Sequence, residues 1–225
     1  MKYTTLYFDL DNTLLDFSAA EAGAIAELLR LYSIDPKPEY IKLYSHTNKK
    51  YWERFERGEI KREDIFEGRF IEFAHLIGVS VDTKKMSYDY FSLLANGHDT
   101  VSGAQDVLKF AKDRGYIICV TTNGVSKTQH KRIKDSGLKK YFDYVFISED
   151  TGHKKPEKAY FDYVFRNTPE KDRRKILIIG DSMSSDILGG KNSGIDTCWL
   201  NAEKKTAVYL PTYEISNIKE LIGIL

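Results

Sequence analysis

Short apolar runs that alternate with helix-like segments constrain the fold of this chain more than any other feature. From about Gly115 onward the alternation is regular, and a polar segment follows each apolar run. Strands that are apolar almost throughout are typical of a parallel sheet with helices on both faces. The sequence therefore predicts an α/β fold, with strands at residues 117–121, 144–147, 176–179 and 197–200 and helices at residues 126–136, 158–167 and 185–193.

Residues 16–95 interrupt this alternation. They contain few strand signals and predict helices at residues 19–32, 40–57, 64–77 and 83–95. An insert placed directly after the first strand would lie over the carboxyl ends of the strands, where open α/β sheets bind ligands. We therefore expect two parts, a parallel-sheet core formed by residues 1–15 and 96–225, and an inserted α-helical cap domain formed by residues 16–95.

The insert is rich in aromatic residues at helical spacing. Core packing is the simpler explanation for such a pattern, and stacking on a substrate is the alternative. The residues concerned are Tyr51, Trp52, Phe55, Phe66, Phe70 and Phe73.

The first apolar run ends in two carboxylates, Asp9 and Asp11, two residues apart. Alternate residues of an extended strand face the same way, so both side chains could point out of its carboxyl end. In such a pair one carboxylate can act as nucleophile and the other can transfer protons, provided that a cation relieves their repulsion. An Asp-rich turn after a strand is the alternative, because Asp and Asn favour turns.

Three further polar segments follow the later strands. Each has an ordinary explanation as a turn, a solvated loop or a helix cap, but their joint order is much less ordinary. The first segment, Thr122-Asn123-Gly124, can present hydrogen-bond donors to an anion at a helix N-terminus. The second, Lys154-Lys155-Pro156, offers a lysine next to a proline. The third, Gly180-Asp181 with Asp186, contains another pair of carboxylates.

The charges of these segments imply a cation. Four carboxylates would meet at one edge of the sheet, and at ~4 Å each like-charge pair costs about 4 kcal/mol at an effective dielectric constant of 20. Oxygen ligands without nearby His or Cys select a hard cation, and Mg²⁺ fits best because it also binds phosphate. The histidines His46, His75, His98, His130 and His153 show no zinc-ligand spacing.

The composition excludes several classes of protein. Lys plus Arg number 34 and Asp plus Glu number 33, a formal charge of +1 that gives no footprint for nucleic acid or a membrane surface. The two cysteines, Cys119 and Cys198, lie in strand-like runs without a metal or disulfide spacing. The N-terminus leads directly into the first strand, and no apolar stretch reaches ~18 residues. We therefore expect a cytoplasmic protein; the sequence makes no prediction about oligomeric state.

Taken in order, the four polar segments resemble the four motifs of the haloacid dehalogenase-like hydrolase superfamily. The resemblance implies a Rossmann-like catalytic core, residues 1–15 and 96–225, with a helical cap inserted after the first motif. Within this superfamily the chain is similar to the pyrimidine 5′-nucleotidase subfamily that acts on non-standard nucleotides. The similarity to the subfamily lies in residues 51–60 and 68–70 of the insert, in Gln129 and Arg132 after the second motif, and in residues 185–190 and 198–201.

The resemblance implies a role for each motif residue. Asp9 would attack phosphorus and form an aspartyl phosphate, while Asp11 would protonate the leaving alcohol and then activate water. Mg²⁺ would be held by the carboxylates of Asp9 and Asp181 and the Asp11 carbonyl, with Asp186 as a ligand or a support. Phosphoryl oxygens would be bound by Thr122, Asn123 and the adjoining Gly124, and Lys155, in preference to its neighbour Lys154, would neutralise charge.

The resemblance leaves several functions in competition. The leading hypothesis is a Mg²⁺-dependent phosphomonoesterase that prefers nucleoside 5′-monophosphates, with the cap closing over the sugar and base. The alternative keeps the chemistry but acts on a sugar phosphate, phosphoglycolate or another small phosphometabolite. A dehalogenase is disfavoured because Asp11 supplies the acid–base carboxylate expected of the phosphatases. A binding protein without turnover is disfavoured because every motif residue is present.

Overall fold

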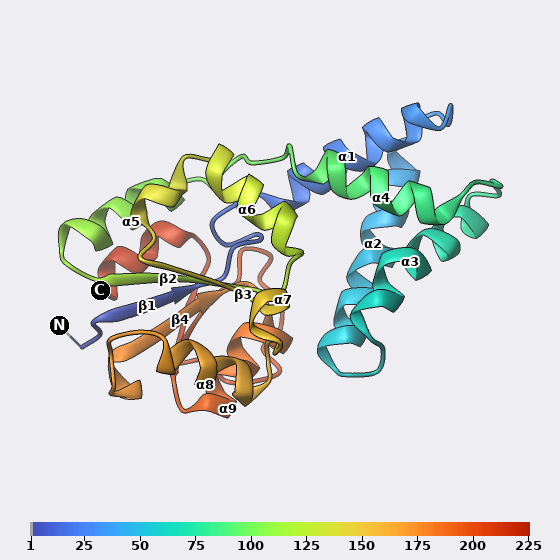
Figure 1. Ribbon diagram of the computed structural model, residues 1–225. Coiled ribbons are helices and arrows are strands. Elements are labelled where there is room, and N and C mark those ends of the chain that lie inside the picture. Colours follow the sequence, from blue (N-terminus) through green and yellow to red (C-terminus); the bar gives the residue numbers. More distant parts are fainter. Residues whose placement is uncertain (1) are drawn as a thin grey trace. The chain divides into compact units, whose positions relative to one another are not determined.

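The computed structural model describes residues 2–225 and divides into two compact units (Figure 1). The first, the core unit, combines Met1–Asp16 with Asp99–Leu225, and the second, the helical unit, is Phe17–His98. From the sequence, the boundaries between core and insert were expected between residues 15 and 16 and between residues 95 and 96. In the structure these boundaries lie one and three residues later, respectively.

The core unit is built on a six-stranded sheet in the order β3-β2-β1-β4-β5-β6. Every neighbouring pair of strands is parallel. The predicted α/β class with a Rossmann-like core is thereby confirmed, since the sheet has the strand order of doubly wound nucleotide-binding folds. The strands are β1 (Thr5–Phe8), β2 (Ile117–Thr122), β3 (Tyr144–Ile147), β4 (Ile176–Gly180), β5 (Asp196–Leu200) and β6 (Tyr213–Ile215).

Alternate side chains of the strands enter two separate apolar layers. Leu6 and Phe8 of β1 pack in the layer that contains α5 (Ala104–Asp113) and part of α6 (Ser126–Asp135). Tyr7 packs in the layer that contains α8 (Lys158–Arg166). Figure 1 shows these helices on the two faces of the sheet. Burial on both faces explains why the strands are apolar at nearly every position.

Both cysteines belong to this core. Cys119 and Cys198 are buried and carry free thiols, and burial raises the pKa of both groups. A buried thiol with a raised pKa is a weak nucleophile, so the two cysteines are packing residues.

Helix α5 and strand β6 of the core unit were not predicted from the sequence. Helix α5 buries Ala104, Val107, Leu108 and Ala111, an i, i+3, i+4, i+7 pattern that the sequence does carry. Strand β6 has only three residues and lies at the edge of the sheet, too short to give a periodic signal.

The helix expected at residues 185–193 begins differently. A π-helical turn, Met183–Ile187, precedes the short helix α9 (Leu188–Ser193). Within this turn the Ser182 side chain caps the amide of Ser185, and the Asp186 carboxylate accepts from the Ser182 amide. The local hydrogen bonds of these two side chains accompany the change from α-helical geometry.

The remaining short elements of the core unit connect its strands. They are the helix α7 (Ser148–Thr151) and the 3₁₀ turns η1 (Leu138–Tyr141), η2 (Arg173–Lys175) and η4 (Ile218–Gly223).

The helical unit consists of α1 (Phe17–Leu31), α2 (Pro38–Glu56), α3 (Arg62–Leu76) and α4 (Thr83–Leu94). Pro38 occupies the first position of α2, where its missing N–H costs no hydrogen bond. Asp82 caps α4 by accepting from the amide of Lys85. Of the aromatic residues noted in the sequence, Phe70 and Phe73 are part of the unit's core.

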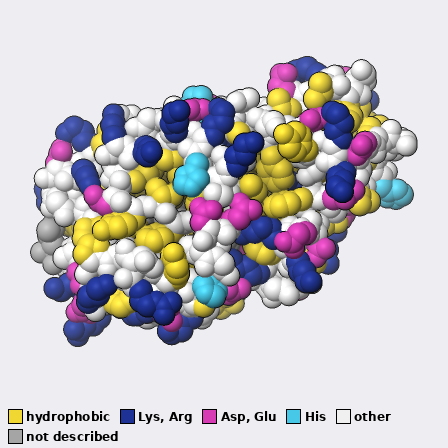
Figure 2. Space-filling view, viewed as in Figure 1, with side chains coloured by type: hydrophobic (Ala, Val, Ile, Leu, Met, Phe, Trp, Pro, Cys, Tyr) yellow, Lys and Arg dark blue, Asp and Glu magenta, His cyan; other side chains and the backbone are white. Residues whose placement is uncertain are grey.

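Two further observations concern the charges on the surface and the suitability of the helices for crossing a membrane. Figure 2 shows Lys and Arg side chains interspersed with Asp and Glu on the visible face. Within residues 2–225, none of the helices has both the length and the apolar composition that a bilayer crossing demands.

We expect Leu108→Ala to destabilise the core unit. Leu108 is fully buried on α5 between the helix and the sheet, and truncation of a buried Leu costs about 2–5 kcal/mol of unfolding free energy. Urea denaturation measures the change. The matched control is Lys109→Ala on the same helix, whose exposed side chain pairs with Asp113 in an i, i+4 ion pair worth about 0.3–0.5 kcal/mol. Equal losses in the two variants would contradict this packing.

Candidate active site

The candidate site forms where β1, β2 and β4 end. Because β1 pairs with β2 on one side and β4 on the other, the residues that follow these strands meet at one edge. The amide of Asp9 donates to the carbonyl of Ile179 (2.8 Å), which continues the pairing of β1 with β4 by one residue. This edge also lies where the strand order reverses, the position at which doubly wound sheets bind ligands.

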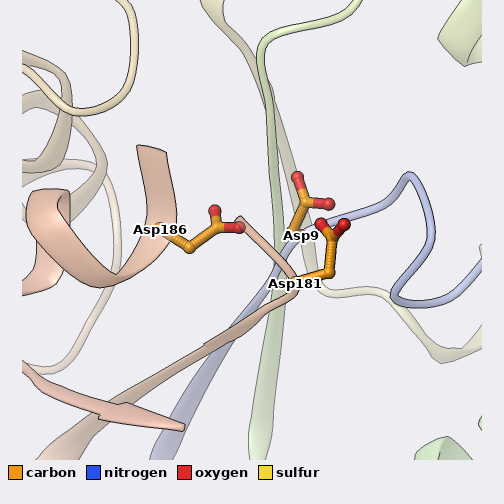
Figure 3. A group of neighbouring side chains, drawn as sticks. All are labelled: Asp9, Asp181 and Asp186. Carbon is orange, nitrogen blue, oxygen red and sulfur yellow. The ribbon is translucent and has the colours of Figure 1, made fainter. Parts of the chain in front are cut away.

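Three carboxylates gather at this edge. Asp9 follows β1, Asp181 follows β4, and Asp186 lies in the π-helical turn; one oxygen from each lies within 4.8 Å of the others. Asp9 and Asp186 are buried, whereas Asp181 is half-buried. Figure 3 shows Asp9 beside Asp181, with Asp186 directed toward them from its own turn. A cluster of carboxylate oxygens of this kind is suited to a hard cation.

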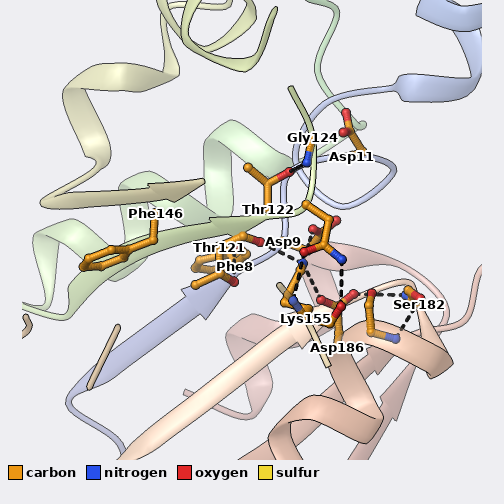
Figure 4. A network of polar contacts seen from close by, with 12 residues as sticks. Phe8, Asp9, Asp11, Thr121, Thr122, Gly124, Phe146, Lys155, Ser182 and Asp186 are labelled. Carbon is orange, nitrogen blue, oxygen red and sulfur yellow. Dashed lines mark hydrogen bonds and ion pairs between the residues drawn. The ribbon is translucent and has the colours of Figure 1, made fainter. Parts of the chain in front are cut away.

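Lys155 enters the same cluster as its buried cation. The ammonium donates to Asp9 Oδ1 (2.5 Å), to Asp186 Oδ1 (2.7 Å) and to the carbonyl of Thr121 (2.8 Å) (Figure 4). The Lys155 side chain is only 1% exposed, so its charge is balanced by protein groups and not by bulk water. Of the two adjacent lysines, Lys155 is therefore the one whose ammonium contacts Asp9.

Asn123 positions the backbone of Lys155. Its amide nitrogen donates to the carbonyl of Lys155 (2.9 Å), and its carbonyl oxygen accepts from the amide of Lys155 (2.9 Å). The sequence predicted that Asn123 would hold an anion. The structure gives its side chain an additional task, which is to join the loop after β2 to the lysine loop.

The pKa values of this cluster reflect burial and unbalanced charge. Burial raises the pKa of Asp9 well above its usual value, and the carboxylates of Asp186, Asp181 and Asp11 raise it further against the opposing effect of Lys155. Burial lowers the pKa of Lys155, but Asp186 and Asp9 more than offset this and raise it overall. The lysine is therefore a permanent cation, and the carboxylates still exceed the positive charge beside them.

The hydroxyl of Thr122 is oriented by two donors. Its oxygen accepts from the amide of Gly124 (3.1 Å) and from Nε2 of Gln129 (3.1 Å). Both contacts use lone pairs of the oxygen, so the hydroxyl proton is directed elsewhere as a donor. Gly124 makes room for this arrangement, because a Cβ at that position would lie 2.3 Å from Nε2 of Gln129.

Asp11 is held by helix α6 and not by the carboxylate cluster. Arg132 Nη1 donates to Asp11 Oδ1, and Gln129 Nε2 donates to Asp11 Oδ2 (2.6 Å). In Figure 4 the Asp11 side chain lies away from Asp186, on the side of Thr122 and Gly124. The eight predicted site residues thus fall into two neighbouring groups, with Thr122 and Asp11 linked through Gln129.

The roles of Gln129 and Arg132 were not predicted from the sequence. They entered the sequence analysis only as part of a resemblance, because the sequence shows their spacing on the helix but not their burial. The two residues are three apart on α6, so they share one face of the helix, and both are buried although polar. A buried polar pair at this spacing, directly after an anion-binding segment, indicates that the helix face is directed at a charged group.

Two further contacts fix the loop after β4, and neither was predicted. Trp199 Nε1 donates to the carbonyl of Asp181 (2.9 Å), and the Ser182 amide donates to Asp186 Oδ2 (3.1 Å). At the end of β4, a Cβ on Gly180 would lie 2.1 Å from Asp186 Oδ2. The loop is therefore shaped around the Asp186 carboxylate.

Comparison with known proteins places this geometry in one family. The profile of the family described as haloacid dehalogenase-like hydrolase matches residues 6–200. The chain is 40% identical to the HAD-hydrolase YfnB of Bacillus subtilis, covering 100% of this chain and 96% of that protein. A crystal structure of YfnB bound to magnesium, described as revealing interdomain movement, superposes with a TM-score of 0.94 over 100% of this chain and 99% of that one.

Two of the curated relatives are pyrimidine 5′-nucleotidases. The pyrimidine 5′-nucleotidase PynA of Streptococcus pneumoniae is 36% identical, over 100% of this chain and 96% of its own length. The pyrimidine 5′-nucleotidase YjjG of Escherichia coli is 33% identical, over 100% of this chain and 99% of its own length. Both similarities extend through the helical unit as well as the core unit.

We expect Lys155→Met to destabilise the metal-free protein at pH 7. The change removes the cation from between two buried carboxylates, and breaking a buried ion pair on one side costs about 3–5 kcal/mol. Denaturant unfolding in the presence of a chelator measures the loss. Lys158→Met is the matched control: the Lys158 side chain is 60% exposed and pairs with Asp162, so the loss is at most about 1 kcal/mol. A comparably small effect of Lys155→Met would mean that the cluster does not depend on the lysine.

Proposed function

The chain belongs to the haloacid dehalogenase-like hydrolase family, and from that premise we propose that it is a Mg²⁺-dependent phosphomonoesterase that prefers nucleoside 5′-monophosphates. The observation that carries the proposal is the contact of Lys155 with Asp9 inside the carboxylate cluster at the end of β1. A carboxylate so placed is both desolvated and held in one orientation. These are the conditions under which it can act as a nucleophile toward phosphorus.

The chemistry of Asp9 and Asp11 proceeds in two steps. A carboxylate oxygen of Asp9 forms a bond to phosphorus as the bond to the ester oxygen breaks, and Asp11 gives its proton to the departing alkoxide. Water then attacks the phosphorus of the aspartyl phosphate, Asp11 takes its proton, and Asp9 is released with inorganic phosphate. Lys155 neutralises charge on Asp9 and on the phosphoryl group through both steps.

Thr122 and Lys155 supply the groups that bind phosphoryl oxygens. The Thr122 hydroxyl has its oxygen occupied by two donors, so its proton is available to a phosphoryl oxygen. A phosphate dianion approaching this edge meets three carboxylates and one ammonium, an excess of negative charge that would repel it. The charge balance of the site therefore supports a bound cation.

The donor set fits Mg²⁺. The carboxylates of Asp9 and Asp181 and the carbonyl of Asp11 would hold the ion, and a bound Mg²⁺ would polarise the phosphoryl oxygens and offset their charge. Asp186 fits a supporting place, since its Oδ1 accepts from Lys155 and its Oδ2 from the Ser182 amide. The magnesium-bound crystal structure of YfnB supports this assignment.

The preference for nucleotides rests on the two nucleotidases. PynA and YjjG align with this chain from end to end, including residues 17–98. We propose that residues 17–98 act as a cap that selects the leaving group, and the interdomain movement described for YfnB is consistent with such a part. The same two-step chemistry would serve any phosphate monoester, so substrate choice is tested separately from mechanism.

We expect purified protein to release phosphate from nucleoside 5′-monophosphates in the presence of Mg²⁺. Asp9→Asn keeps the shape of the side chain but removes the nucleophile, and should lower kcat by roughly 10³-fold or more. Phosphate release is measured on a panel of nucleoside 5′-monophosphates, 3′-monophosphates and sugar phosphates, with and without a chelator. The structural control is Asp113→Asn, an exposed aspartate on α5.

The panel separates the parts of the proposal. A higher kcat/KM for sugar phosphates than for 5′-monophosphates would overturn the nucleotide preference and leave the mechanism. Full activity of Asp9→Asn would overturn the mechanism whatever the substrate.

We also expect Mg²⁺ to stabilise the folded protein. A ligand present at 100 times its Kd and bound only by the folded state adds about 2.7 kcal/mol of stability. Thermal unfolding with MgCl₂ against NaCl of equal ionic strength measures the effect. Asp181→Asn should abolish most of the shift, whereas Asp113→Asn should retain it; equal shifts in both variants would place the ion elsewhere.

A further inference from the structure

We propose that Arg132 and Gln129 are positioning residues that hold Asp11 in place for proton transfer and tie it to Thr122. The inference rests on the proposed function, because it assigns to Asp11 the acid–base role. It concerns side chains of α6 and of the loops after β1 and β2, all within the core unit.

The contacts form a closed network. Arg132 Nη1 donates both to Asp11 Oδ1 and to Oε1 of Gln129, the latter at 3.0 Å. Gln129 Nε2 donates to Asp11 Oδ2 (2.6 Å) and to Thr122 Oγ1 (3.1 Å). Because the arginine contacts the amide oxygen of Gln129, the amide nitrogen is turned toward Asp11 and Thr122. Each member of the network thus sets the orientation of the next.

The network leaves one side of Asp11 open. The Arg132 side chain is 1% exposed, whereas that of Asp11 is 27% exposed, so the carboxylate is held from the protein side and accessible from the other. A carboxylate can accept about four hydrogen bonds, and Arg132 and Gln129 each donate one, to different oxygens of Asp11. A lone pair on each oxygen is still available for the proton that the reaction moves.

The cost of the arrangement supports a functional role. A guanidinium loses its hydration when it is buried, and pairing with a carboxylate often no more than offsets that loss. A buried apolar residue on α6 would serve packing at least as well. What the arginine adds is a fixed direction for the side chain of Asp11, which lies in the polar turn after β1.

The backbone also makes room for the network. A Cβ at position 124 would lie 2.3 Å from Nε2 and 2.6 Å from Cδ of Gln129. The glycine of the second motif thus allows the glutamine to reach both Asp11 and Thr122. The anion-binding segment and the acid–base residue are therefore built around a common side chain.

The test compares a poor leaving group with a good one. An alkoxide leaves slowly unless it is protonated, whereas p-nitrophenolate leaves without help. If Arg132 and Gln129 act through Asp11, then Arg132→Met and Gln129→Met should lower kcat for a nucleoside 5′-monophosphate by roughly 10²-fold, with KM changed much less. With p-nitrophenyl phosphate the first turnover should survive, and slow hydrolysis of the aspartyl phosphate should appear as a burst of nitrophenolate.

Two controls are matched to these variants. Lys131→Met removes one positive charge from the same helix at an exposed position and should leave both substrates unaffected. Arg132→Lys, which keeps the charge but not the fork of donors, should recover part of the rate and serves as the variant of choice if Arg132→Met does not fold.

A double mutant separates action through Asp11 from direct action on the substrate. Adding Arg132→Met to Asp11→Asn should cost no further rate, because the residue that it positions is already disabled. A further loss of tenfold or more, or a KM raised in step with the loss of kcat, would mean that Arg132 binds the phosphate itself and would overturn the proposal.

The outcomes also separate this inference from the proposed function. A wild-type protein that releases phosphate from no monoester would refute the proposed function. A wild-type protein that does so, with Arg132→Met and Gln129→Met retaining full kcat on the nucleotide, would refute the positioning role alone. Loss of the first turnover of p-nitrophenyl phosphate equal to the loss on the nucleotide would likewise overturn it.

Discussion

The parallel pairing of β1 between β2 and β4 is the constraint on which the rest of the core unit depends. It places the ends of three strands at one edge although they are separated by long stretches of chain. Asp9, Thr122 and Asp181 consequently meet without any local sequence relationship. Once these backbones are fixed, the loop that carries Lys155 has only to add a cation to a carboxylate cluster that already exists.

Much of this arrangement could be predicted because its residues directly follow apolar strands. The strand ends are visible in the sequence, and parallel strands bring their carboxyl ends together, so Asp9 and Asp181 could be placed at one edge. What the sequence could not predict are contacts that depend on side-chain direction. Arg132 on Asp11, and Trp199 on the Asp181 carbonyl, join segments whose separation in sequence carries no periodic signal. The π-helical turn at Asp186 was missed because it depends on two local side-chain hydrogen bonds.

The two polar groups of the site differ in how their charges are balanced. Around Asp9 the carboxylates outnumber the cations; burial raises the pKa of Asp9, and this excess of carboxylates raises it further. Around Asp11 one guanidinium faces one carboxylate, and an amide completes the contacts. The first group is thus suited to recruiting a cation and an anion together, while in the second the charge of the Asp11 carboxylate is already balanced within the protein. In a site with both groups, the bound ions can change around Asp9 while the side chains around Asp11 keep their geometry.

The glycine at the end of β4 has a consequence for how this chain can vary. The space that a side chain at position 180 would need is already occupied by the Asp186 carboxylate, six residues later. The two positions therefore share a single volume, and a larger residue at one requires a smaller or differently directed residue at the other. Among related sequences we therefore expect positions 180 and 186 to change together or not at all, because the absence of a side chain at one leaves room for the carboxylate at the other.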